Sequence, residues 1–240
     1  TIEGLRLNGE GIAGLDVLEG VTGHESDPQE VEIGLDVDLL DVDGEQPGTL
    51  PLAAELDRRD NELNPTAGYY LDLGVTPFLG LEGTTNGTRV TLDSRAYRSV
   101  ERLTFAGRLQ LGSVVGPALA ETLPTYRFFS GGGGTVRGQS YQSLAVDLGG
   151  DSVGGRSFLG LSGELRRSVT DEIQIVGFAD WGYIGAESFP DFTGESHAGA
   201  GLGLRYNTGI GPIRLDVATP IAGDTDGSNF FIYVGIGQAF

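Results

Sequence analysis

Alternation of apolar and polar residues with a period of two runs through most of this chain, and it limits the possible folds more than any other feature. Between residues 171 and 184, Ile173, Ile175 and Trp181 share one face of an extended chain, and Asp180 lies on the other. Such runs span about ten to fourteen residues, longer than the five or six of an ordinary globular strand. They match the tilted strands of about 9–11 residues that cross a bilayer in β-barrels. The pattern predicts an all-β chain of antiparallel strands.

Turn-forming residues divide the chain into about eleven predicted strands. We expect them near residues 10–22, 30–42, 48–58, 66–80, 86–100, 101–114, 154–168, 171–184, 196–208, 211–220 and 229–240, with a partial strand at residues 2–8. The connection at residues 115–153 is far longer than the others, which indicates a functional loop. The pattern contains no linker and no second domain.

The polar faces favour a membrane barrel over a soluble β-sandwich, which stays open as an alternative. They mix Gly, Arg, Asp and Gln, a composition suited to a wet lumen lined with ion pairs. We expect Arg205, Arg214 and Asp216 to form such pairs rather than to contact a substrate. The predicted fold is therefore an antiparallel transmembrane β-barrel of the outer-membrane type.

Composition excludes several classes of function. The chain has no Cys and only two His, which excludes cysteine-based zinc sites, disulfide frameworks and multi-histidine metal centres. Neither His24 nor His197 accompanies a nucleophile elbow, so we expect no covalent catalysis, no metal and no cofactor. A net charge of −19 opposes binding to nucleic acid. The chain lacks a starting Met and a leader, which predicts a mature chain or an excised piece.

The last predicted strand ends on an aromatic residue, as bacterial outer-membrane barrels commonly do. In such barrels the terminal strand serves as an assembly signal, and its alternation here places one row of residues on a single face: Phe230, Ile232, Val234, Ile236 and Phe240. Gln238 is the one polar residue in that row.

The long connection carries a distinctive run of motifs. Arg127-Phe128-Phe129 precedes four glycines, and Val136-Arg137-Gly138 and Tyr141-Gln142-Ser143 follow them. The glycines are Gly131, Gly132, Gly133 and Gly134. No Gly-Lys-Ser/Thr follows this run, which argues against a phosphate-binding loop. We expect the four glycines to let the backbone adopt positive φ and pass close to a wall.

Three further motifs accompany the loop in a fixed order. They are the turn at residues 60–68, the strand motif Phe178-x-Asp180-x-Gly182, and the hairpin of residues 201–216. Over residues 55–240 the set resembles the bacterial surface antigen family, the outer-membrane assembly and translocation barrels of the BamA/TamA type. The amino-acid sequence of the loop and the final Gly-Gln-Ala-Phe are most similar to those of TamA-like members.

The resemblance implies a barrel of sixteen strands, of which this chain holds about 11–12. It makes residues 1–240 the C-terminal part of the barrel, with the POTRA domains and the first strands outside this chain. It also implies that the long loop folds back into the lumen, where Arg137 pairs with Asp180 beside Phe178 and Gly182. We expect this pair to lock the loop and stabilise the barrel near its seam. Gln139 departs from the family, which usually has an aromatic residue there.

The function implied by the resemblance is that of an insertase or translocase without enzymatic chemistry. It would help outer-membrane proteins such as autotransporters to enter the bilayer, by offering an unpaired strand edge at a lateral seam. The implied partners are the lipid bilayer, client proteins and a periplasm-spanning subunit, and the implied location is the outer membrane of a Gram-negative bacterium. The alternatives are a two-partner-secretion exporter, the membrane anchor of an upstream lipase-type enzyme, and a diffusion porin.

Overall fold

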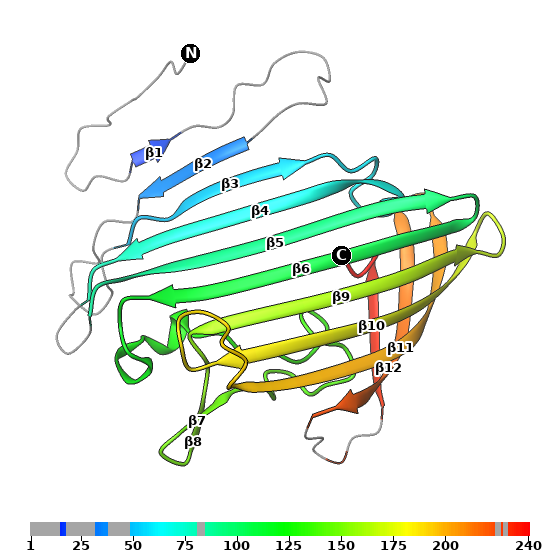
Figure 1. The fold of residues 1–240 in the computed structure, drawn as a ribbon. Coiled ribbons are helices and arrows are strands. Elements are labelled where there is room, and N and C mark those ends of the chain that lie inside the picture. The colour runs from blue at the N-terminus through cyan, green and yellow to red at the C-terminus, as the bar shows by residue number, and fades with distance from the viewer. Residues whose placement is uncertain (1–14, 18–31, 38–48, 81–84, 224–226, 228–229) are drawn as a thin grey trace.

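The computed structural model describes residues 15–17, 32–37, 49–80, 85–223, 227 and 230–240. These residues form one antiparallel sheet of 11 strands whose order follows the chain (Figure 1). The strands are β1 (Leu15–Val17), β2 (Glu32–Val37), β3 (Leu52–Asp57), β4 (Ala67–Phe78), β5 (Gly87–Val100), β6 (Leu103–Val115), β9 (Ser157–Ser168), β10 (Ile173–Gly185), β11 (Glu195–Thr208), β12 (Gly211–Ala222) and β13 (Phe231–Ile236).

The predicted strands from residue 48 onward coincide with β3 to β13 within a few residues, apart from the last one. The predicted strands at residues 10–22 and 30–42 are described only as β1 and β2, and the predicted partial strand at residues 2–8 lies outside the described residues. In the part of the chain that the structure describes, no pairing joins β1 to β13, so the sheet is curved but open.

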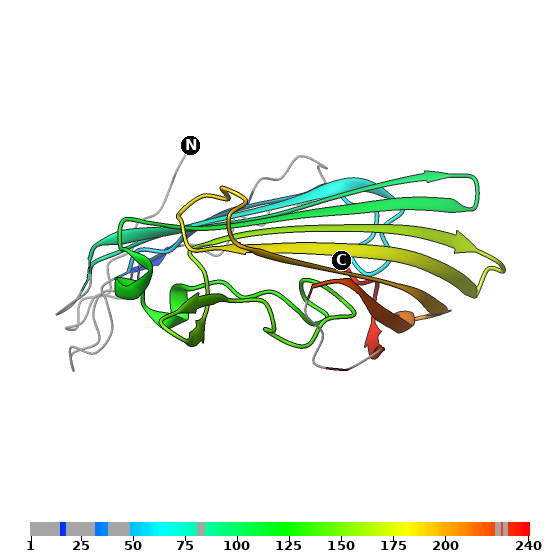
Figure 2. The same ribbon diagram turned by 60° about the horizontal axis from the view of Figure 1, so that its bottom comes forward.

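The long connection runs from residue 116 to residue 156 and folds against one face of the sheet. It contains the short 3-10 helices η1 (Leu119–Glu121) and η2 (Pro124–Tyr126) and a small hairpin of β7 (Val146–Leu148) and β8 (Asp151–Val153). Figure 2 shows this segment beneath the sheet, on the side toward which β12 and β13 curl. The strands on either side of it, β6 and β9, pair directly with each other, so the loop leaves the sheet without interrupting it.

Burial is inverted relative to a soluble protein. Large apolar side chains such as Leu202 and Val234 are 68% and 73% exposed on the convex face. Charged side chains such as Arg205 and Asp216 are fully buried on the concave face. Because a soluble β-sandwich hides its apolar faces between two sheets, the sandwich alternative is wrong. An apolar exterior around a charged interior is the arrangement of a β-barrel that faces lipid.

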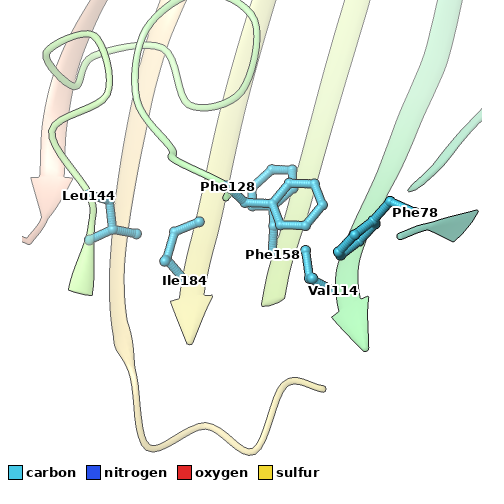
Figure 3. Packing of buried hydrophobic residues seen from close by; sticks show 6 residues of the cluster. All are labelled: Phe78, Val114, Phe128, Leu144, Phe158 and Ile184. Carbon is cyan, nitrogen blue, oxygen red and sulfur yellow. The ribbon is translucent and has the colours of Figure 1, made fainter. Parts of the chain in front are cut away.

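An apolar cluster anchors the loop at one end of the concave face (Figure 3). Phe128 and Leu144 of the loop pack against side chains from the strands, and Phe128 stacks on Phe158 with ring centroids 6.4 Å apart. The strand members are Phe78, Val114, Phe158 and Ile184. This cluster supplies the hydrophobic contribution to loop docking, and the polar site described below lies beyond it.

The prediction for the last strand is partly wrong. Ile232, Val234 and Ile236 do alternate outward, and Phe230 just before β13 is also exposed. Phe240, however, is buried with Tyr97 and Ala106 on the concave face. The physical reason is Gly237, whose φ of +86° turns the chain inward after Ile236 and removes Phe240 from the lipid-facing row.

Candidate functional site

The loop enters the concave side as a narrow stem. Phe128 bridges Gly155, and Ser130 bridges Leu144, in antiparallel fashion. The Ser130 hydroxyl also lies 2.9 Å from His197 Nε2 of β11, and both side chains are buried. These contacts hold the base of the tip formed by residues 131–143 against the wall.

The glycine run shapes the tip, though only half of it has the expected backbone. Gly131 and Gly132 have φ values of +116° and +88°, whereas Gly133 and Gly134 do not adopt positive φ. A Cβ at Gly133 would come within 3.1 Å of the Tyr233 ring, and one at Gly134 would meet nothing within 4 Å. The expectation of positive φ throughout the run was therefore wrong for its second half.

Arg137 at the tip lies in a buried cage of carboxylates. Its Nε donates to Asp180 Oδ2 at 2.7 Å and its Nη2 to Asp180 Oδ1 at 3.0 Å, a bidentate pair. The backbone N–H of Arg137 also donates to Asp180, at 3.0 Å. Nη1 donates to Glu164 at 2.5 Å and to Asp216 at 3.3 Å. The guanidinium carbon lies 3.6 Å from the centroid of the Phe178 ring, a cation–π contact.

The neighbouring carboxylates stabilise the charged form of Arg137. Burial alone would lower the pKa of the guanidinium, but the hydrogen bonds and charges of Asp180 and Glu164 outweigh it and raise the pKa above its usual value. Arg137 is 3% exposed, so both partners have lost their water. A buried pair of this kind contributes chiefly by fixing geometry, since breaking it leaves an unpaired charge in a dry site.

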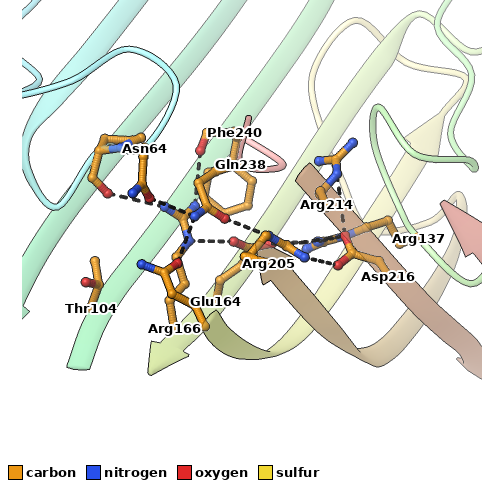
Figure 4. Close-up of polar contacts among 12 residues, drawn as sticks. Asn64, Thr104, Arg137, Glu164, Arg166, Arg205, Arg214, Asp216, Gln238 and Phe240 are labelled. Atoms are coloured by element: carbon orange, nitrogen blue, oxygen red, sulfur yellow. Dashed lines mark hydrogen bonds and ion pairs between the residues drawn. The ribbon is translucent and has the colours of Figure 1, made fainter. Parts of the chain in front are cut away.

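The cage continues as a network across the concave face (Figure 4). Glu164 accepts from Arg166 Nε at 2.8 Å, and Asp216 accepts from Arg205 Nη1 at 2.5 Å. Arg214 Nε lies 3.8 Å from Asp216, a looser ion pair. The structure thus brings the three predicted lumen residues together in one network with the Arg137 cage.

The network also reaches the C-terminal tail. Arg205 donates to Gln238 at 2.8 Å, and the Gln238 amide donates to Asn64 in the turn between β3 and β4 at 2.8 Å. Arg166 donates to the main-chain oxygen of Phe240 at 3.1 Å. The inward turn at Gly237 therefore places the tail on the charged face rather than in lipid.

Glycines on the wall make room for the loop tip. A Cβ at Gly182 of β10 would collide with Ser130 and come within 2.8 Å of Val136. A Cβ at Gly199 of β11 would collide with the carbonyl of Arg137. Gly182 therefore belongs to the site because it has no side chain, and Val136, which is fully buried, fills the space beside it.

Gln139 replaces the expected aromatic residue with a polar clamp. Its Nε2 donates to the carbonyls of Ala198 and Ala222 at 2.7 and 2.8 Å, and the side chain is 2% exposed. These two carbonyls lie where the β11–β12 register shifts, at a bulge between Ala198 and Gly199. The glutamine amide thus satisfies backbone acceptors beside an irregularity in the ladder.

Two further contacts tie the tip to the last strands. The N–H of Gly138 donates to the Tyr233 hydroxyl of β13 at 3.0 Å. Gly138 has φ +87°, and a Cβ there would come within 2.6 Å of the carbonyl of Thr219 on β12. The loop tip is therefore hydrogen-bonded to each strand from β9 to β13, and it also packs closely against β12.

Two predicted loop residues lie apart from the cage. Tyr141 is 79% exposed at the turn of the tip. Gln142 adopts positive φ of 54°, a turn conformation. They shape the return of the loop to its stem and do not contact Arg137.

Sequence reasoning missed Glu164, Arg166 and Tyr233 as site residues, and it noted Gln139 only as a departure from the family pattern. Glu164 and Arg166 occupy inward positions of an alternating strand in which Leu161 and Leu165 face outward. The period-two pattern could therefore have predicted that both charged side chains face the lumen. Their proximity to Arg137 depends on which strands are neighbours in the sheet, which the pattern alone does not specify.

No cluster of three or more His, Asp or Glu suited to a metal ion exists among the residues that the structure describes. Within the same residues, no helix is long and apolar enough to span a membrane.

Comparison with known proteins identifies the family. A model described as the Omp85 superfamily domain matches residues 46–240. The chain belongs to the Omp85 superfamily. The match covers nearly the whole described sheet together with the loop, so this fold is an Omp85 barrel region of outer-membrane type, a class that serves protein assembly and transport.

A solved structure shares this Omp85 fold. It is the crystal structure of BamA from Haemophilus ducreyi lacking POTRA domains 1–3, with a TM-score of 0.63 and 19% sequence identity. The match covers 77% of this chain and 41% of that one, so this chain spans less than half of the BamA chain.

Proposed function

We propose that this chain is the barrel region of an insertase or translocase that assembles or exports outer-membrane proteins such as autotransporters in a Gram-negative bacterium. The single observation that carries the proposal is the buried Arg137–Asp180 pair, which fastens a long loop inside a barrel with an apolar exterior. A loop fastened across the lumen narrows the path that a diffusion pore keeps open, which favours this proposal over a porin. The proposed mechanism needs no cofactor and no covalent step.

We propose that β13 forms one side of a lateral seam. It has six residues, whereas β9 to β12 have 12–14, and among the described residues it pairs only with β12. An unpaired strand edge inside hydrocarbon is unstable because its N–H and C=O groups lack partners. A client strand that adds to this edge would satisfy those groups while it leaves water.

The loop lock contributes rigidity on the side of the seam. Gly138 donates to Tyr233 of β13, so the loop that holds Arg137 also holds the seam strand. We propose that the loop keeps β13 in a defined orientation while its free edge receives a client. A periplasm-spanning subunit is the expected partner that would deliver such clients.

Site-specific crosslinking in the full protein tests the seam. These 240 residues contain no Cys, so a cysteine introduced among them is the only thiol of this region. A cysteine at Val234 of β13 is expected to crosslink to a cysteine-bearing β-barrel client during its insertion into liposomes. A matched cysteine at Leu161 of central strand β9 also faces outward and is expected to remain unlinked.

The destination of the client separates the candidate functions. A client that becomes protease-resistant and membrane-embedded supports the insertase proposal. A client recovered in solution on the far side of the membrane supports the two-partner-secretion alternative instead. Equal crosslinking at Val234 and Leu161 would contradict the proposed seam.

A further inference from the structure

Three arginines gather on the outer face, at the end of the sheet where short turns join the strands. Arg98 is near the end of β5, Arg102 is in the turn that follows, and Arg167 is near the end of β9. All three side chains are exposed, and none forms an ion pair with another described residue. On the concave face, by contrast, Arg137, Arg166 and Arg205 are all paired.

The strand register brings these arginines to one area. Arg98 is opposite Phe105 of β6, and Arg167 is opposite Leu103 of the same strand. They are thus two strands and two residues apart, which places their Cα atoms about 12 Å from each other. Arginine side chains are long enough to converge on one headgroup over that distance.

Acidic side chains lie farther out than Arg98 and Arg167. Glu101 belongs to the turn between β5 and β6, and Asp171 and Glu172 to the turn between β9 and β10. Arg98 and Arg167 therefore occupy the level between the apolar strand surface and the turns, and Arg102 lies in the turn beside them. In a membrane barrel this is the level of the lipid headgroups.

A shallow, mostly apolar groove of about 640 Å³ includes Arg98 in its lining and runs from there toward the middle of the outer face. Its outward-facing lining includes Ala96, Phe105, Leu109 and Leu161. Gly107 forms part of its floor, and a Cβ at that residue would meet nothing within 4 Å. The Gly107 row lies about 7 Å deeper than the Arg98 row, since it is two residues along the strand.

We propose that this surface binds an anionic glycerophospholipid of the periplasmic leaflet, with its phosphate on Arg98 and Arg167 and an acyl chain in the groove. Guanidinium groups bind phosphate through paired, charge-assisted hydrogen bonds. The groove adjoins the cationic row on its membrane side, as the shape of a phospholipid requires. At the same end of β10 to β13, Ile173, Tyr206, Ile213 and Ile236 occupy the outward positions, so the cationic patch does not extend onto those strands.

The proposal rests on the outer-membrane location, with the short turns toward the periplasm, and not on insertase activity. The experiment measures lipid retention in the absence of any client protein. A negative result would therefore contradict the lipid site and would not bear on the proposed seam.

Native mass spectrometry of the delipidated full protein provides the test. Phosphatidylglycerol is expected to be retained at least about tenfold better than phosphatidylethanolamine with the same acyl chains. The double variant Arg98→Gln/Arg167→Gln should reduce this preference to near unity. Arg127→Gln is the matched control, because Arg127 lies in the loop at the opposite end of the sheet and its side chain donates, among the described residues, only to the Thr122 carbonyl.

A second variant tests the groove separately from the charge. Gly107→Leu fills open space and leaves the arginines intact, so it should weaken phosphatidylglycerol retention without changing the folded barrel seen by electrophoresis. Excess inorganic phosphate should fail to displace the lipid. Equal retention of the two lipids, an unchanged preference in the double variant, or displacement by phosphate alone would each overturn the proposal.

Discussion

Replacing Arg137 by alanine is the most informative perturbation of the loop lock. The substitution removes the guanidinium but keeps the backbone N–H, so Asp180 retains one of its three hydrogen bonds from residue 137. Glu164 keeps Arg166 and Asp216 keeps Arg205, each at hydrogen-bond distance. One buried carboxylate is therefore left largely uncompensated.

The expected loss of stability follows from the one carboxylate that is left without its partner. Breaking one buried ion pair by removing a partner destabilises a protein by about 3–5 kcal/mol. Barrel unfolding in detergent is read as a rate, and each 1.36 kcal/mol on the barrier changes a rate tenfold. We expect the contacts of Arg137 to be mostly broken in the transition state for unfolding, so that their loss acts mainly on the unfolding rate. Arg137→Ala should then shorten the unfolding half-life by about two to three orders of magnitude.

Heat-dependent migration in detergent gels measures this half-life, because a folded barrel and its unfolded chain run differently. Arg137→Lys should recover only part of the loss, since lysine keeps the charge but not the bidentate fork. Arg137→Met combined with Asp180→Asn should lose less than the sum of the single variants, because both charges leave together. A half-life within about threefold of the unmodified protein for Arg137→Ala would refute the reasoning, and Arg127→Ala is the control for loss of a loop arginine.

Three further outcomes are expected from the same assay. Gln139→Leu should destabilise the barrel by about 1–3 kcal/mol, because it leaves two carbonyls at the β11–β12 bulge without their donor; an unchanged half-life would show that they find other partners. Gly138→Ala should loosen the loop, since its positive φ and close contact with β12 exclude a side chain, whereas Gly134→Ala meets open space and should behave like the unmodified protein; equal effects would refute this account. Burial has the largest single effect on Asp60 and raises its pKa, but the hydrogen bonds from Thr66 and from the N–H of Ala67 together outweigh burial, so the net pKa is below its usual value. The contribution of Asp60 to stability is therefore complete above the pKa of about 4 that an aspartate has in the unfolded chain, and it is lost as the pH falls through the lower pKa of the folded state. Asp60→Asn should remove that part of the acid sensitivity when unfolding half-lives are compared from about pH 5 to about pH 2.

Much of the fold could be predicted because a strand's two faces are encoded locally. The alternation that places Leu202 and Leu204 outward and Arg205 inward requires only neighbouring residues, since successive side chains point to opposite sides. The same pattern put Asp180 on the lumen side. The family motifs then supplied its partner in the loop, which periodicity alone could not supply.

The end of the chain shows where local reading fails. Phe240 continues the period of Ile232, Val234 and Ile236, yet one glycine with positive φ sends it to the opposite face. Glycine permits both signs of φ at similar cost, so the sequence does not say which one the chain adopts. The contacts of Gln238 and Phe240 across the concave face select the turn.

The sequence by itself determined the strand positions, the inverted polarity, the absence of thiol chemistry and the identity of the loop motif. Only the tertiary structure decided that Glu164 and Asp216 join Asp180 around Arg137, that Gln139 spans two strands, and that Arg98 and Arg167 meet on one outer patch. The reason is physical: alternation determines the face on which a residue lies, whereas register and curvature determine its neighbours. Charges far apart in the chain come together only when the sheet curls around the loop.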